Sequence, residues 1–395
     1  SFKLGKWTEI HNSIVKELNR SYVDTLPVDR IMRAAVDAML EELDPYTVYI
    51  PEEENEDFEM LVSKTYGGIG AIIHKKKDEN VIINEPYFGS PAHKYGLVCG
   101  DEIIAIDGMP TKGLESKDAS DKMKGKPGTT VTFKVKKVRT GDTLDVPIVR
   151  ERIHFPDIEY AGMLNDTTGY ILQTGFTEGV ANQIKEKYNE LKKAGMKKLV
   201  LDLRGNGGGQ DTYYKPYLKL LYDKECLSKG VEIRNSDDNI NYLKTQVERL
   251  PWLQEVIDKA QSSDEAFVPL VEDYVIKYDT VHTYPIKAAI IIDSNVASSG
   301  EQMLLDIRGC SSRTKIYGKG NTLGCLDYSN IRRADMKGSK ITTWIPMTRS
   351  SRLPDEGIDE TGIAPDVRIS LPLPKVLSDN VDEWVLWIAE DMKKE

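Results

Sequence analysis

Apolar positions near the start of the chain recur at helical spacing, first over residues 7–18 and then over residues 28–43. Pro27 stands where the second helix would begin, and Asp44-Pro45 stands where it would end. We therefore expect residues 1–64 to form a small helical cap.

The pattern changes over residues 65–152 to short β-rich runs that are separated by Gly- and Pro-containing turn signals. The runs cover residues 69–74, 80–83, 102–106, 130–136 and 143–149. One short helix is expected to open at Ser90-Pro91, and another to span about residues 116–124. These elements predict a small, partly open β-barrel with two helices.

From Gly169 onward the pattern becomes strand and then helix, repeated. Strands are expected over residues 169–172, 198–203 and 286–293, and helices over residues 178–194 and 298–306. Such alternation favours an α/β core over residues 153–395, with strands in the middle and helices outside. Residues 210–285 are polar and helix-leaning, and we interpret them as a helical insertion or lid. The fold class is therefore an α/β multidomain protein.

Composition narrows the classes of function. The net charge is −10 and the pI is near 5.3, which does not favour a nucleic-acid partner. The four cysteines lack CxxC spacing and the five histidines are scattered, so neither a metal site nor a cofactor is expected. No apolar run reaches the ~20 residues of a membrane span. The chain does not begin with Met, so membrane association is expected only through a targeting segment that has been removed.

The first candidate for chemistry is the apolar strand that ends in Arg204-Gly-Asn-Gly-Gly-Gly209. Backbone N–H groups in such a turn form an anion nest, which suits a phosphate or the oxyanion of a tetrahedral intermediate. A phosphate loop would continue with Gly-Lys-Ser/Thr, whereas Gln210-Asp211 follows here. The alternative is an ordinary tight turn.

The second candidate is Asp293-Ser-Asn-Val-Ala-Ser-Ser-Gly-Glu301, which follows a buried strand. A serine at a strand-to-helix junction is exposed, and the helix N-terminus stabilises negative charge beside it. The alternative is a helix N-cap with Glu301 completing a capping box. Both interpretations stay open on the residues alone.

The third candidate is the succession of Tyr66-Gly-Gly-Ile-Gly70, Gly89-Ser-Pro-Ala92 and Gly100-Asp-Glu-Ile-Ile-Ala-Ile-Asp-Gly108. Its order is typical of a PDZ-type module. Such modules add a peptide terminus as a strand to an open sheet edge and hold its carboxylate in a backbone nest.

Together these motifs resemble the carboxyl-terminal processing (tail-specific) peptidases. The resemblance rests on Leu43-Asp-Pro-Tyr-Thr47, Gly67-Gly-Ile-Gly70, Asp202-Leu-Arg204, Ala297-Ser-Ser-Gly-Glu301 and Gly362-Ile-Ala-Pro-Asp366. It implies a crotonase-like α/β core and a serine endopeptidase that cleaves proteins or peptides near their C-termini. It also implies export to a periplasm or cell envelope.

The resemblance assigns roles to individual residues. Ser298 matches the nucleophile, and the N–H groups of Ser299 and Gly208 match the oxyanion donors. The strand that receives the substrate terminus corresponds to Gly68, Ile69, Gly70 and Ala71.

The chain departs from the family at the general base, which is usually a lysine with a glutamine four residues on. Here Cys325 and Ser329 occupy those positions. Lys319, in the same loop, is our candidate base, with an ordinary surface lysine as the alternative. Glu360 could orient a polar network or serve as a turn cap.

Three hypotheses follow. The first is an active serine peptidase that uses Ser298. The second is a homologue that binds C-terminal peptides without turnover, because the Lys/Gln pair is missing. The third is acyl-CoA chemistry on the same core, which the PDZ-type module disfavours because a small-molecule enzyme has no use for a strand-capturing groove.

Overall fold

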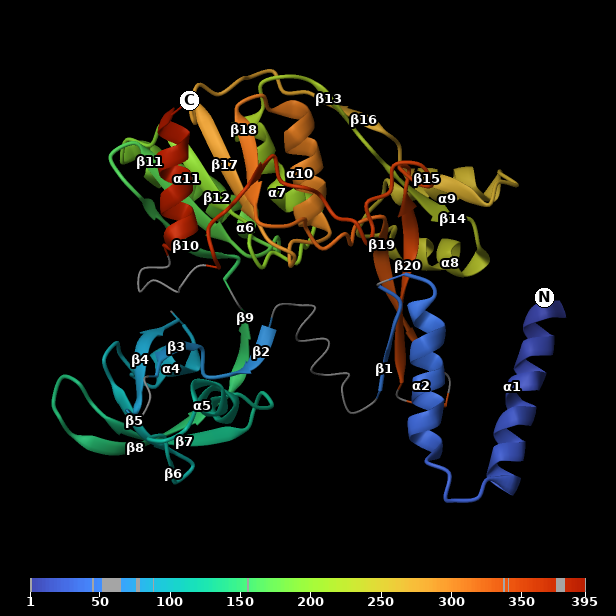
Figure 1. The fold of residues 1–395 in the computed structure, drawn as a ribbon, viewed down its shortest axis with the longest axis horizontal. Coiled ribbons are helices and arrows are strands. Elements are labelled where there is room, and N and C mark those ends of the chain that lie inside the picture. The colour runs from blue at the N-terminus through green and yellow to red at the C-terminus, as the bar shows by residue number, and fades with distance from the viewer. Residues whose placement is uncertain are drawn as a thin grey trace.

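The computed structural model describes residues 2–44, 46–51, 65–75, 79–87, 89–154, 156–336, 338–339, 341–373 and 381–394 (Figure 1). Pro45, which belongs to one of the predicted helix ends, lies outside these residues.

The N-terminal segment forms helices α1 (Phe2–Ser21) and α2 (Val28–Glu41), followed by strand β1 (Val48–Ile50). None of the described residues of α1 and α2 is buried. Helix α2 stands beside the long hairpin of β19 (Tyr328–Asp335) and β20 (Thr342–Ser350), and α1 lies on the other side of α2 (Figure 1). Strand β1 pairs antiparallel with β20 (Thr342–Ser350). Within the predicted helical cap, residues 48–50 therefore form a strand, because pairing with a distant partner overrides the local pattern.

The following unit is a twisted antiparallel sheet with two short helices. Its elements are β2 (Thr65–Gly68), β3 (Ala71–His74), β4 (Val81–Pro86), α4 (Pro91–Lys94), β5 (Glu102–Ile106), β6 (Met109–Pro110), α5 (Ser116–Met123), β7 (Thr130–Lys136), β8 (Thr143–Val149) and β9 (Glu151–His154). The sheet order is β3-β4-β5-β7-β8, which leaves β3 at an edge, while β2 pairs with β9. Ser90 caps α4, and Pro91 occupies its first position, as expected.

The α/β core holds the order β10-β11-β12-β17-β18-β21. Its strands are β10 (Ile158–Met163), β11 (Thr168–Gln173), β12 (Lys198–Asp202), β17 (Lys287–Ile292), β18 (Thr314–Gly318) and β21 (Val367–Arg368). Within this sheet, strands β11, β12, β17, β18 and β21 run parallel to one another, and β10 is antiparallel to β11. Helices α6 (Val180–Lys193), α7 (Asp211–Leu221) and α10 (Ser299–Cys310) cover one face, and α11 (Glu383–Lys394) covers the other (Figure 1).

The sheet is buried on both faces because successive side chains point to opposite sides. Leu199 and Leu201 pack toward α6 and α7, whereas Val200 packs toward α11. The prediction of strands inside and helices outside is confirmed.

The prediction of a helical insertion over residues 210–285 is only partly right. Helix α7 packs into the main core, and α8 (Asp237–Gln246) and α9 (Leu253–Gln261) form a smaller cluster. The segment also contains β13 (Cys226–Ser228), β14 (Val231–Arg234), β15 (Phe267–Val271) and β16 (Tyr274–Ile276). Strands β14 and β15 extend the sheet of β1, β20 and β19 (Tyr328–Asp335). These strands exist because β14 finds β20 more than a hundred residues away.

Candidate active site

The candidate site lies where two parallel neighbouring strands end. Strands β12 and β17 are adjacent and parallel, so their carboxyl ends share one edge of the sheet. The glycine bend of residues 205–209 follows β12, and the turn of residues 293–298 follows β17. The two segments touch: the N–H of Ala297 donates to the carbonyl oxygen of Asn206 at 3.0 Å. The structure thus brings the first two candidate motifs together.

Ser298 occupies a strained turn at the N-terminus of α10. Its φ is 53° and its ψ is −123°, and a non-glycine residue held at such angles costs about 1–3 kcal/mol. The surroundings hold it there, because its N–H donates to the carbonyl oxygen of Cys325 at 2.9 Å and to Oε2 of Glu301 at 3.3 Å. Ser298 is half-buried. Strain of this kind clusters at sites that perform chemistry.

Glu301 links the serine turn to the loop that carries Cys325. Its side chain is fully buried, and its carboxylate accepts from Gly324 N at 2.7 Å, Cys325 N at 2.9 Å and Thr322 Oγ1 at 2.5 Å. Burial raises the pKa of this carboxyl group, while the same hydrogen bonds oppose the rise. The hydrogen bond from the N–H of Ser298 to the Glu301 carboxylate, which the predicted capping box requires, is therefore present. The same carboxylate also holds the loop of residues 322–325 next to Ser298.

Gly208 lies directly against the serine. A Cβ atom built on Gly208 would stand 2.7 Å from Cβ of Ser298 and 3.0 Å from N of Ser299, and its φ is +103°. Only glycine fits such a close approach at this φ. The N–H of Gly208 donates to Oδ1 of Asn206 at 2.9 Å in the free chain, and Oγ of Ser299 donates to the carbonyl oxygen of Gly209 at 3.0 Å. Ser298, Ser299 and Gly208 are therefore assembled at one place.

Lys319 does not join them in its described contacts. Its side chain is exposed, and Nζ donates to the carbonyl oxygen of Leu371 at 3.3 Å. Ser329, where the resemblance expects glutamine, lies in β19 and shares a 2.8 Å hydrogen bond with Thr348. Glu360 is exposed and lies at a φ of +66°.

A polar cluster of Tyr46, Cys325 and Asp359 occupies the position beside the serine instead. The Tyr46 hydroxyl hydrogen-bonds to the Cys325 thiol and lies 3.4 Å from Oδ1 of Asp359. Burial raises the pKa of the thiol to about 11 and also raises the pKa values of Tyr46 and Asp359. Oδ2 of Asp359 is buried and, among the described residues, has no hydrogen-bond partner. The sequence did not predict this cluster. Tyr46 belongs to the motif Leu43-Asp-Pro-Tyr-Thr47, and Asp359 directly precedes Glu360, which was considered for a polar network.

Two histidines, His154 and His282, make their hydrogen bonds away from Ser298. Nε2 of His154 is 3.0 Å from Oγ1 of Thr177, at the connection between the PDZ-like unit and the core. The carbonyl oxygen of His282 accepts from Arg313 at 2.6 Å, and burial lowers the pKa of its imidazole. Neither imidazole contacts Ser298 in the part of the chain that the structure describes.

The proposed tail-binding residues span the end of β2 at Gly68, the two-residue turn of Ile69 and Gly70, and the start of the edge strand β3 at Ala71. The carbonyl oxygen of Ile69 accepts from Ala92 N at 2.8 Å, and that of Gly70 accepts from Ser90 Oγ at 2.8 Å. Gly70 has a φ of +71°, and a Cβ atom built on it would stand 2.5 Å from Cβ of Ser90. The carbonyl groups of Ile69 and Gly70 therefore hold this turn against α4, next to β3, which is the edge strand of its sheet among the described residues.

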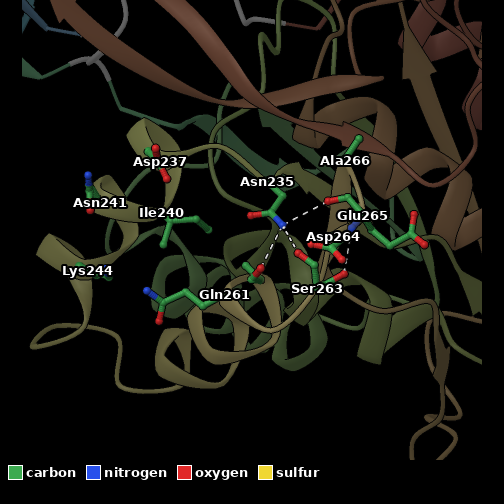
Figure 2. A pocket seen from close by; sticks show the side chains of 11 residues that line it. Asn235, Asp237, Ile240, Asn241, Lys244, Gln261, Ser263, Asp264, Glu265 and Ala266 are labelled. Atoms are coloured by element: carbon green, nitrogen blue, oxygen red, sulfur yellow. Dashed lines mark hydrogen bonds between the residues drawn. The ribbon is translucent and has the colours of Figure 1, made fainter.

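A polar hollow of about 430 Å³ lies on the cluster of α8, α9 and β15 (Figure 2). Figure 2 shows Asn235 at its centre, where Nδ2 donates to the carbonyl oxygens of Ala260, Ser263 and Glu265 at 3.0 to 3.1 Å. Its lining contains none of the candidate site residues, and the amide of Asn235 fastens the turn between α9 and β15.

Neither a metal cluster nor a membrane helix occurs in the described part of the chain. Its residues contain no group of three or more His, Cys, Asp or Glu side chains that could hold a metal ion. None of the described helices combines the length and apolar character needed to cross a membrane.

Comparison with known proteins finds matches to both the PDZ-like unit and the α/β core. The model of peptidase family S41 matches residues 167–369, and a PDZ domain model matches residues 82–137. The carboxy-terminal processing protease CtpA of Bacillus subtilis is 28% identical over 363 residues, which cover 91% of this chain and 68% of the relative. A probable CtpA-like serine protease of Staphylococcus aureus is 35% identical over 270 residues, 66% of this chain and 53% of the relative. The chain thus spans about half the length of that relative.

Solved structures of similar proteins superpose on this chain only with low TM-scores. The photosystem II D1 C-terminal processing protease has a TM-score of 0.41 at 20% identity, covering 90% of this chain and 87% of that protein. Mature CPAF has a TM-score of 0.42 at 12% identity, covering 77% and 78%.

The S41 match extends over more than half of the residues and includes both strand ends that form the candidate site. The chain is homologous to CtpA-like carboxy-terminal processing serine proteases that carry a PDZ domain. It belongs to peptidase family S41.

Proposed function

We propose that this chain is a serine endopeptidase that cleaves proteins or peptides near their C-termini, with the PDZ domain capturing the substrate tail. The observation that carries the proposal is the close approach of Ser298, at the N-terminus of α10, to the glycine bend at Gly208. We also place the protein in the periplasm or cell envelope, on family resemblance.

The proposed course begins with attack of Ser298 Oγ on the substrate carbonyl carbon. The N–H groups of Ser299 and Gly208 hold the resulting oxyanion, which requires the Gly208 N–H to leave Oδ1 of Asn206. The amine leaves with the proton that Oγ has lost, and water then hydrolyses the acyl-enzyme ester.

We infer that Asp359, rather than Lys319, accepts that proton. The carbonyl group of Cys325 binds the N–H of Ser298, so the Tyr46–Cys325–Asp359 cluster adjoins the nucleophile. The raised pKa values of Tyr46 and Cys325 keep both protonated near neutral pH, so the carboxylate is the acceptor of the cluster. Its buried Oδ2 still lacks a donor among the described residues.

This assignment predicts the pH profile. Asp359 must be ionised to act, and because burial raises its pKa, kcat/KM should fall as the pH drops through a value above the ordinary carboxyl range of about 4. Asp359→Asn keeps an oxygen for the N–H groups of Leu326 and Asp327 and should lower the rate about 10²- to 10⁴-fold.

Lys319→Met is the matched comparison. It should leave the rate within about twofold, because it changes only an exposed side chain. A lysine base would instead require the rate to rise toward the alkaline range of an ammonium group, whose ordinary pKa is about 10.4. Such an alkaline limb, lost in Lys319→Met, would overturn the assignment.

Tail capture predicts a dependence on the free C-terminal carboxylate. Peptides with an amidated end should bind about 10- to 100-fold more weakly, because a charge-assisted hydrogen bond is lost. Gly70→Ala should weaken binding at least about tenfold, since its Cβ atom would collide with Ser90 in the loop. Fluorescence anisotropy with a labelled peptide measures both effects.

Gly141→Ala provides the control for backbone strain. Gly141 also has a positive φ, +78°, but no atom lies within 4 Å of a Cβ atom built on it, and it sits at the β7–β8 turn. Its replacement should leave peptide affinity unchanged. Equal losses in both variants, or equal affinity for amidated and free peptides, would rule out this mode of capture.

A further inference from the structure

Two cysteines lie against each other at the far end of the helix that begins after Ser298. Cys226 opens β13, and Cys310 is the last residue of α10. Each thiol lies close enough to the other to affect its pKa. Sγ of Cys226 also lies 3.6 Å from the carbonyl oxygen of Asp306, four residues before Cys310 and therefore one helical turn away.

The backbone on both sides holds the two sulfur atoms in place. A Cβ atom built on Gly309 would stand 2.9 Å from Sγ of Cys226 and 3.0 Å from its Cβ, so β13 lies directly on the last turn of α10. The N–H groups of Asp223 and Lys224 donate to the carbonyl oxygen of Cys310 at 3.0 and 3.2 Å. Figure 1 shows β13 beside α10.

We propose that Cys226 and Cys310 form a dithiol–disulfide site that can covalently fasten β13 to the nucleophile helix. The reactant is an external disulfide, such as oxidised glutathione. The Cys226 thiolate attacks one sulfur of that disulfide and releases one thiol. The Cys310 thiolate then attacks Sγ of Cys226 and releases the second thiol, so the two cysteine protons end on the two released thiols.

Accessibility fixes this order of attack. Cys226 is half-buried, whereas Cys310 is fully buried, so an external disulfide meets Cys226 first. Burial raises the pKa of Cys310 to about 12 and also raises that of Cys226, so few thiolates exist at neutral pH. The reaction should therefore be slow at pH 7 and faster at pH 9.

The bond would close a loop from residue 226 to residue 310, which contains α8, α9, β15, β17 and Ser298. Closing so long a loop restricts the unfolded chain and stabilises the folded one. The oxidised protein should therefore unfold at a higher temperature than the reduced protein, and the difference should disappear on reduction.

The test is oxidation of the folded protein with glutathione disulfide, followed by peptide mass mapping without reduction. The expected product is a Cys226–Cys310 cross-linked peptide with two hydrogen atoms fewer than the separate thiols. In Cys310→Ser, Cys226 should instead retain glutathione as a mixed disulfide. Cys99→Ser, which alters an exposed cysteine, should form the cross-link as the unaltered chain does.

If the Cys310→Ser variant does not fold, a second measurement on the unaltered chain tests the same proposal. Phenylarsine oxide binds tightly only where two thiols are neighbours. In the unaltered chain it should protect Cys226 and Cys310 together from oxidation by glutathione disulfide. The proposal fails if both thiols stay reduced at pH 9 and unprotected by the arsenical, or if cross-links to Cys99 or Cys325 form as readily.

Discussion

Cleavage is expected to fall on the order of 10⁴-fold or more when Ser298 is replaced by alanine. The reason is chemical: the hydroxyl supplies the atom that bonds to the substrate carbonyl carbon, and its neighbours Ser299 and Cys325 cannot replace it. The Ser299 hydroxyl is already committed to the carbonyl oxygen of Gly209, and burial raises the pKa of the Cys325 thiol. The rate of cleavage of an unstructured polypeptide measures the effect.

Ser294→Ala is the matched control, because Ser294 is exposed in the same turn. It should cleave at the unaltered rate. A fluorophosphonate probe should add to Ser298 in the unaltered chain and in Ser294→Ala, and to neither serine in Ser298→Ala. Undiminished cleavage by Ser298→Ala would refute the proposed nucleophile. Tail binding without any adduct or cleavage would leave a peptide-binding protein.

Gly208→Ala is expected to lower kcat/KM about 10²- to 10³-fold, the loss that follows removal of one oxyanion donor. The added Cβ atom would stand 2.7 Å from Cβ of Ser298, and real Cβ atoms do not approach so closely. Either the serine or the glycine bend must then move. The residue also has a φ of +103°, which strains any L side chain.

Gly207→Ala separates this effect from a general need for glycine in the bend. No atom lies within 4 Å of a Cβ built on Gly207, and its φ is not positive. Its replacement should leave kcat/KM and the thermal unfolding temperature nearly unchanged. If the two variants lost activity equally, the close approach of Gly208 to Ser298 would not be the cause.

Local patterns were sufficient to predict the elements that hold the nucleophile. Strands β12 and β17 are continuous apolar runs, and each ends in a polar turn, so both their type and their carboxyl ends could be located. Their adjacency follows from parallel α/β topology, in which such ends meet at one edge.

Long-range pairing explains what the patterns could not reveal. Strand β14 is a run of only four residues, and it became a strand because β20 lies beside it. The Tyr46–Asp359 contact joins residues 313 positions apart, so no spacing along the chain could indicate it. Lys319 was the candidate base because it shares a loop with Cys325, yet neighbours in sequence can point to different partners, and its amine binds Leu371.

That same contact between Tyr46 and Asp359 has a consequence during synthesis. A ribosome makes Tyr46 313 residues before it makes Asp359. Because the cluster needs both residues, a nascent chain that contains Ser298 but has not yet reached Asp359 has an incomplete proton-accepting cluster. Under the proposed mechanism, such a chain is therefore latent, and it cannot attack its neighbours on the polysome before Asp359 has been added.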